Sequence, residues 1–167
     1  MPADLKLAPD SPVPATADSR RGPPVPAAAI RIVLADDHEL VRRSVRALLD
    51  GEDGMDVVAE ASDMDSTLRL VRDERPAVLV LDLWMPGSSG VGAIEPLRKQ
   101  VPDTQIVVMT MQDAPAFAEH VLGAGAVGFV VKEHAADELA FAVRAAARSE
   151  RYVSPRVARG GRSPAPA

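Results

Sequence analysis

Residues 77–87, with the sequence AVLVLDLWMPG, decide the fold of this chain. Five apolar residues run into the carboxylate of Asp82, and a Pro-Gly turn follows closely. A short apolar run bounded by turn residues predicts a strand buried on both faces, as in a parallel sheet covered by helices. Open α/β sheets bind ligands at the carboxyl ends of their strands, which is where Asp82 lies. Taken alone, Asp82 is better explained as the first solvated residue after a strand, so its role depends on what the other strands bring to the same edge.

The remaining sequence repeats a β-α unit. Further strands are predicted over residues 30–35, 55–61, 104–109 and 127–131. Helices are predicted over residues 38–49, 64–74, 90–100, 114–122 and 135–149. Pro96 lies inside the third helix and cannot donate a backbone hydrogen bond, which predicts a kink or a late start. The pattern predicts an α/β fold: a doubly wound, flavodoxin-like parallel sheet of five strands in the order 2-1-3-4-5, with five helices.

Proline marks the ends of the domain. Seven of the 15 prolines lie in the first 30 residues and three in the last 17. We therefore expect a disordered Pro/Ala-rich leader over residues 1–29, one domain over 30–150, and a flexible basic Pro/Ala-rich tail over 151–167. Neither a signal peptide nor an apolar run near the roughly 20 residues that span a bilayer is found, which predicts a cytoplasmic protein without a membrane partner. Cysteine is absent, which excludes disulfides and thiolate metal sites.

The charge is unevenly distributed. Residues 31–150 hold 12 basic and 21 acidic side chains, whereas residues 151–167 hold four arginines and no acid. An acidic domain argues against direct binding of nucleic acid, because the phosphate backbone supplies most of that affinity. It is compatible with a site that gathers carboxylates around a cation.

Three carboxylates are expected at one point of the sheet edge. Asp36 and Asp37 end the first strand and Asp82 ends the third, and these strands are neighbours in the predicted order. Three such groups repel one another unless a cation intervenes, and Mg²⁺ prefers oxygen ligands of this kind. Asp37 would also serve as the N-cap of the following helix.

Two further strands bring a hydroxyl and a cation to this edge. Thr110 ends the fourth strand, and Lys132 ends the fifth as one of only two lysines in residues 31–150. A metal, a cation and a hydroxyl around one carboxylate form a cradle for a phosphoryl group, whose transfer depends on positioning and charge neutralisation. His38 could act as a base but fits better as an exposed residue of the first helical turn. Each of these groups alone is explained by a helix cap, a turn or a solvated strand end, but chance does not explain all of them together.

With this set of residues, the chain resembles a response-regulator receiver domain over about residues 30–150. Several details are similar to the NarL/FixJ class: the Met-Pro-Gly turn at 85–87, Thr110-Met111, the GAVGFVVK run at 125–132 and the SERYVSP sequence at 149–155. The resemblance implies a signalling switch of two-component systems that promotes its own phosphorylation and dephosphorylation without being a turnover enzyme. It also implies a sensor histidine kinase as the partner.

The resemblance also implies a role for each site residue. Asp82 would accept the phosphoryl group from a kinase phosphohistidine. Asp37 would bind Mg²⁺ directly, Asp36 through water, and Asp82 and the Trp84 carbonyl would complete the ligands. Lys132 would hold a phosphoryl oxygen, Thr110 would move toward the phosphoryl group, and Phe129 would turn inward as the coupled aromatic.

Three departures from the family pattern affect function. Trp84 is bulky for the second position after the acceptor, which predicts reduced access of water or a phosphatase. Ala135 and Ala136 replace a common capping Ser-Pro pair, so the last helix is expected to start weakly. No recognition helix follows residue 150, so we expect output through protein contacts, with a homodimer through the fourth helix, fifth strand and fifth helix as a family-based expectation. The downstream partner is not specified by the sequence.

Three alternatives stay open. An aspartyl-phosphate phosphatase would need a second acid two residues after the nucleophile, where this chain has Trp84. A receiver-shaped module that is never phosphorylated would not need the complete set of acids, Thr110 and Lys132. The chain would also suit the receiver half of a DNA-binding regulator whose output domain is missing here.

Overall fold

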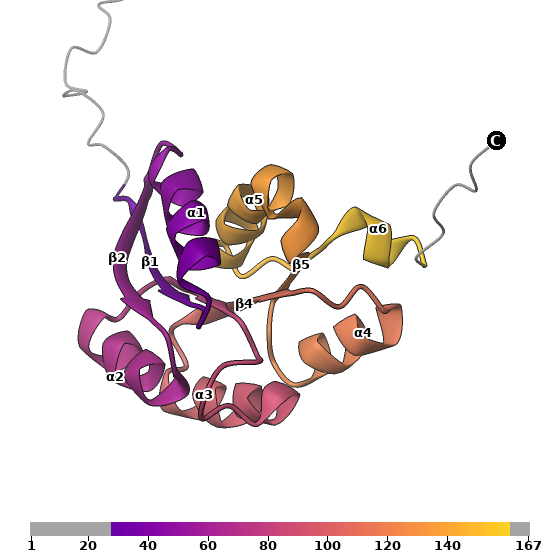
Figure 1. Ribbon diagram of the computed structural model, residues 1–167, viewed down its shortest axis with the longest axis horizontal. Coiled ribbons are helices and arrows are strands. Elements are labelled where there is room, and N and C mark those ends of the chain that lie inside the picture. Colours follow the sequence, from indigo (N-terminus) through magenta and orange to yellow (C-terminus); the bar gives the residue numbers. More distant parts are fainter. Residues whose placement is uncertain (1–27, 161–167) are drawn as a thin grey trace, which may run out of the picture.

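The computed structural model describes residues 28–160, which form one parallel sheet covered by helices (Figure 1). The strand order is β2-β1-β3-β4-β5-β6. The strands are β1 (Ile30–Ala35), β2 (Met55–Ala61), β3 (Val78–Leu81), β4 (Gln105–Thr110), β5 (Gly128–Val131) and β6 (Tyr152–Val153). The helices are α1 (Glu39–Asp50), α2 (Met64–Glu74), α3 (Ile94–Gln100), α4 (Pro115–Gly123), α5 (Ala135–Ala147) and α6 (Pro155–Ala158), with 3₁₀ turns η1 (Gly90–Ala93) and η2 (Lys132–His134). The predicted doubly wound, flavodoxin-like fold is confirmed.

The helices cover both faces of the sheet. Figure 1 shows α1 and α5 on one face and α2, α3 and α4 on the other. Because successive side chains of a strand point to opposite faces, β1 places Ile32 and Leu34 in the core under α1 and α5. Val33 and Ala35 of the same strand enter the core on the other face. Burial of both faces accounts for the continuous apolar runs of the sequence.

The third helix begins late, as its proline predicts. The 3₁₀ turn η1 precedes α3, and Pro96 is the third residue of α3. A residue in the first helical turn has no intrahelical acceptor for its N–H, so proline costs no hydrogen bond there.

The prediction of five strands and five helices is one too few of each. Tyr152–Val153 form a sixth strand beside β5, and Pro155–Ala158 form a sixth helix with Val157 buried. Order therefore extends to residue 160, where the sequence suggested a flexible tail. Residues 1–27 of the expected leader and 161–167 of the expected tail lie outside the described residues. Within residues 28–160, no helix has the length and apolar character needed to cross a bilayer.

Candidate functional site

Two buried carboxylates lie side by side where β1 and β3 end. Ala35 and Leu81 are partners in the parallel register, and the Asp82 N–H donates to the Ala35 carbonyl at 2.9 Å. Asp36 and Asp82, the next residue of each strand, are therefore neighbours, and both are buried. The strand-end placement predicted for these two residues is confirmed.

Lys132 balances both carboxylates. Its Nζ donates to Asp82 Oδ2 at 2.7 Å and lies 2.7 Å from Asp36 Oδ2. The lysine side chain is only 10% exposed. Burial opposes the charge of Lys132, but the hydrogen bonds and charges of Asp36 and Asp82 outweigh it and raise the pKa of this ammonium above its usual value. One ammonium thus serves two buried carboxylates.

Two oxygens of the acidic cluster are incompletely satisfied. Asp36 Oδ2 and Asp37 Oδ1 are buried and have no aligned hydrogen-bond donor among the described residues, although Lys132 Nζ lies 2.7 Å from the first and His38 Nδ1 2.9 Å from the second. Buried polar atoms are rarely left in this state, so each one needs an explanation. One ligand atom from each of Asp36, Asp37, His38 and Asp82 lies within 4.8 Å of the others. Because three of these groups are carboxylates, the donors fit a hard divalent cation such as Mg²⁺.

Thr110 and Phe129 lie on β4 and β5, the two strands that follow β3 in the order of the sheet. Thr110 ends β4 opposite Val131 of β5, is fully buried, and its Oγ1 accepts the Gln112 N–H at 3.2 Å. Phe129 is fully buried too, and its ring packs edge-on against Phe117 of α4, with ring centroids 6.0 Å apart. The structure therefore places the two expected switch residues on adjacent strands, and the Phe129 ring contacts α4.

Trp84 lies in the loop after β3. Its N–H donates to Asp82 Oδ1 at 2.9 Å, so Asp82 has one oxygen on the Trp84 amide and the other on Lys132. The Trp84 side chain is 56% exposed. Leu40 and Met111, which follow β1 and β4, are also exposed. Solvent-facing apolar side chains thus follow three of the strands that end at this edge.

Two side chains at the start of α1 join the site. His38 is exposed, as the sequence predicts, and its Nδ1 lies 2.9 Å from Asp37 Oδ1. His38 is also the N-cap of α1, so the expectation that Asp37 caps this helix is wrong. Arg42 lies in the second turn of α1, and its guanidinium donates to the Asp36 carbonyl at 2.7 Å. Nothing in the apolar pattern of the helix marks this arginine, although its spacing from Asp36 allows the contact.

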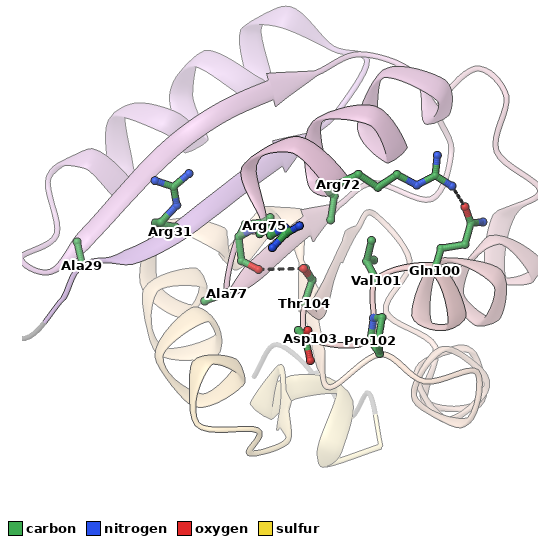
Figure 2. A pocket seen from close by; sticks show the side chains of 12 residues that line it. Ala29, Arg31, Arg72, Arg75, Ala77, Gln100, Val101, Pro102, Asp103 and Thr104 are labelled. Atoms are coloured by element: carbon green, nitrogen blue, oxygen red, sulfur yellow. Dashed lines mark hydrogen bonds between the residues drawn. The ribbon is translucent and has the colours of Figure 1, made fainter.

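A second polar cluster lies at the opposite edge of the sheet. A hollow of about 620 Å³ is lined by residues at the start of β1, before β3 and β4, and at the ends of α2 and α3. Figure 2 shows these side chains. Two of its guanidinium groups have partners: Arg31 contacts Glu74 at 2.6 Å, and Arg72 donates to Gln100. Thr104 donates to the Pro76 carbonyl at 2.9 Å. Because these charges are exposed and paired, the hollow lacks the unsatisfied buried groups of the acidic edge.

Comparison with known proteins identifies the family. Residues 32–144 match the family model described as the response regulator receiver domain. The chain belongs to this family. It is 37% identical over 128 residues to the transcriptional regulatory protein DegU of Brevibacillus brevis, covering 77% of this chain and 54% of DegU. The receiver domain here thus spans little more than half the length of that relative.

Solved receiver structures agree with the fold. A two-component response regulator of the LuxR family from Aurantimonas sp. SI85-9A1 has a TM-score of 0.74 and 37% identity, covering 80% of this chain and 95% of that one. The isolated receiver domain of RcsB from Salmonella enterica serovar Typhimurium, in the presence of phosphomimetic BeF₃⁻, has a TM-score of 0.72 and 28% identity, covering 78% and 97%. The NarL/FixJ-like resemblance seen in the sequence is therefore confirmed.

Proposed function

We propose that this receiver domain is a phosphorylation-dependent switch in which Asp82 accepts a phosphoryl group from a sensor histidine kinase. The observation that carries the proposal is Asp82 itself: a buried carboxylate at a strand end, with one oxygen on the Trp84 N–H and the other on Lys132. Phosphoryl transfer needs a positioned acceptor and neutralised charge rather than acid-base groups. The similarity to a receiver domain studied with a phosphomimetic supports the same reaction.

In the proposed reaction, a carboxylate oxygen of Asp82 attacks phosphorus while the bond from phosphorus to the donor imidazole nitrogen breaks. The electron pair of that bond stays on the imidazole. Lys132 would hold a phosphoryl oxygen and offset its charge. Asp36, Asp37, Asp82 and the Trp84 carbonyl would hold Mg²⁺, which supplies further charge neutralisation. Asp36 Oδ2 and Asp37 Oδ1 support this ligand set, because both are buried and neither has an aligned hydrogen-bond donor among the described residues.

The proposed switch runs through Thr110 and Phe129. Thr110 would move toward the new phosphoryl group and give up its contact with the Gln112 N–H. Because Phe129 is buried against Phe117 of α4, any repacking of the phenyl ring reaches that helix. A switch of this kind is an equilibrium between two packings that the phosphoryl charge biases.

Output is proposed to pass through protein contacts, including a homodimer through the α4-β5-α5 face. The domain would act as a signalling switch and not as a turnover enzyme. A second candidate is the receiver part of a DNA-binding regulator, favoured because the longer relative DegU is named a transcriptional regulatory protein. A cytoplasmic location stays a prediction from the sequence.

The test is phosphoryl uptake from a small phosphodonor with Mg²⁺, followed by intact mass. The wild type should gain one phosphoryl group and Asp82→Asn none. Asp113→Asn is the matched control, because Asp113 is an exposed acid in the loop after β4. Equal labelling of the wild type and Asp82→Asn would refute the acceptor assignment.

A further inference from the structure

Arg42 links three elements at the acidic edge. It belongs to α1, yet its Nη1 donates to the Asp36 carbonyl at the end of β1, at 2.7 Å. Its Nε lies 3.4 Å from Glu60 Oε1 on β2. The side chain is only 18% exposed. An arginine held in this way is part of the packed structure and not a solvated surface charge.

The bond to the Asp36 carbonyl bears directly on Asp37. The Asp36 C=O and the Asp37 N–H belong to one planar peptide unit, so fixing this oxygen restricts the rotation of the plane that carries the Asp37 Cα. Within the described residues, Asp37 Oδ1 has no aligned hydrogen-bond donor, and its close neighbour is Nδ1 of the adjacent, exposed His38 at 2.9 Å. No side chain from another element anchors this oxygen, so the position of the carboxylate depends largely on its own turn.

The turn from β1 to α1 needs such support, because its helix cap is incomplete. The N-cap residue His38 makes no side-chain cap hydrogen bond. The turn is held instead by the His38 N–H, which donates to Asp36 Oδ1 at 2.9 Å, and by Arg42. Loss of Arg42 would leave the carbonyl of a buried residue without this donor, and a changed backbone is one way to satisfy it.

Glu60 compensates the positive charge of Arg42, which lies next to the proposed Mg²⁺ site. It accepts a 2.6 Å hydrogen bond from Arg46 Nη1 through Oε2, while Oε1 faces Arg42. Arg46 is itself anchored to Asp50 at 3.2 Å and to the Val57 carbonyl at 3.2 Å. The charge of Arg42 is thus compensated by Glu60 of β2.

We propose that Arg42 is a positioning residue that fixes the Asp36-Asp37 turn in the geometry that binds a divalent cation. The inference rests on the proposed Mg²⁺-dependent function and deepens it. Outer partners of metal ligands commonly change affinity by roughly tenfold or more when they are removed. Arg42→Ala should therefore weaken Mg²⁺ binding by about tenfold. Arg42→Lys, which keeps a charged donor, should restore part of that loss.

The measurement is a Mg²⁺ titration of the full chain, followed by the fluorescence of Trp84. This is the only tryptophan of the chain, and its N–H is bonded to Asp82. The matched control is Arg43→Ala: Arg43 is the next residue of α1, is 74% exposed and lies 4.0 Å from Glu39. It should bind Mg²⁺ within about twofold of the wild type, as expected for a surface charge. Equal affinity of Arg42→Ala and Arg43→Ala would overturn the inference.

Arg46→Ala separates positioning from general stability. It removes a hydrogen bond to Glu60 but leaves the bond between Arg42 and Asp36 in place. It should lower the thermal unfolding temperature while binding Mg²⁺ far better than Arg42→Ala. If Arg46→Ala loses as much Mg²⁺ affinity as Arg42→Ala, the two arginines act only through the stability of the fold and the inference is wrong.

A second measurement needs no metal. The His38 amide is held by Asp36 Oδ1, so a loosened turn should speed its hydrogen exchange. Exchange should be faster in Arg42→Ala than in Arg46→Ala or the wild type. If the wild type shows no response to Mg²⁺, the proposed function fails. This exchange still tests Arg42, and an unchanged rate in Arg42→Ala would exclude its positioning role.

Discussion

The two edges of the sheet gather charged side chains in opposite ways. At the carboxyl edge, Asp36 and Asp82 are buried and share one ammonium. At the amino edge, Arg31 and Glu74 form an exposed one-to-one pair. Exposed pairs contribute little to stability, whereas buried charges that are incompletely paired are costly. A costly arrangement of this kind indicates a binding site, and an exposed pair does not.

Lys132→Ala should show the largest effect on stability. Removal of the ammonium leaves two buried carboxylates without their cation, and we expect the free energy of unfolding to fall by about 3 kcal/mol without metal. Urea denaturation would measure the change. Lys99→Ala is the control and should cost less than about 0.5 kcal/mol, because Lys99 forms an exposed pair with Glu95.

The same variant tests the division of roles at the acidic edge. We expect Lys132→Ala to bind Mg²⁺ still, with a weaker response to the phosphodonor. Loss of Mg²⁺ binding would mean that the lysine holds the cation site together and that its assignment to the phosphoryl oxygen is wrong.

Addition of Mg²⁺ should stabilise the wild type, by an amount between the effects of Lys132→Ala and Arg31→Ala on the free energy of unfolding. A ligand that binds only the folded state at one hundred times its Kd contributes about 2.7 kcal/mol. Asp37→Asn removes one charged ligand, so Mg²⁺ should stabilise this variant by well under half of that amount, about 1 kcal/mol or less. Thermal unfolding with Mg²⁺ and with a chelator would measure both gains, and equal gains would exclude Asp37 as a ligand.

Arg31→Ala should show the smallest effect. Loss of an exposed pair with Glu74 is expected to cost about 0.5 kcal/mol and to leave phosphoryl uptake unchanged. Urea denaturation and intact mass would measure the two quantities. A loss of phosphoryl uptake would show that the amino edge takes part in function and that the two edges do not differ in this respect.

The sequence predicts the acidic edge well, because the end of each apolar run marks the end of a strand. Asp36, Asp82 and Lys132 each follow an apolar run, and parallel strands must bring their ends to one edge. Thr110 was placed in the same way at the end of its strand. Local patterns therefore suffice wherever the backbone alone brings residues together.

Long side chains and very short elements are the parts that could not be predicted. Arg42 reaches from a helix to a carbonyl six residues away, and hydrophobic periodicity carries no signal for such a contact. Asp37 suits the N-cap position by composition, but the helix begins one residue later than predicted, at Glu39, and His38 is its N-cap. Tyr152–Val153 is too short for any alternation to mark it as a strand, and its neighbour β5 alone determines it.

The segment after Glu150 also protects the sheet from its own edge. The N–H groups of Tyr152 and Ser154 donate to the carbonyls of Val127 and Phe129 at 3.0 and 2.9 Å, and Ser154 Oγ accepts the Val131 N–H at 3.0 Å. An uncovered apolar strand is a template for pairing with another chain. A protein cut after residue 150, where the composition suggests a boundary, would expose the outer edge of Gly128–Val131 and should aggregate.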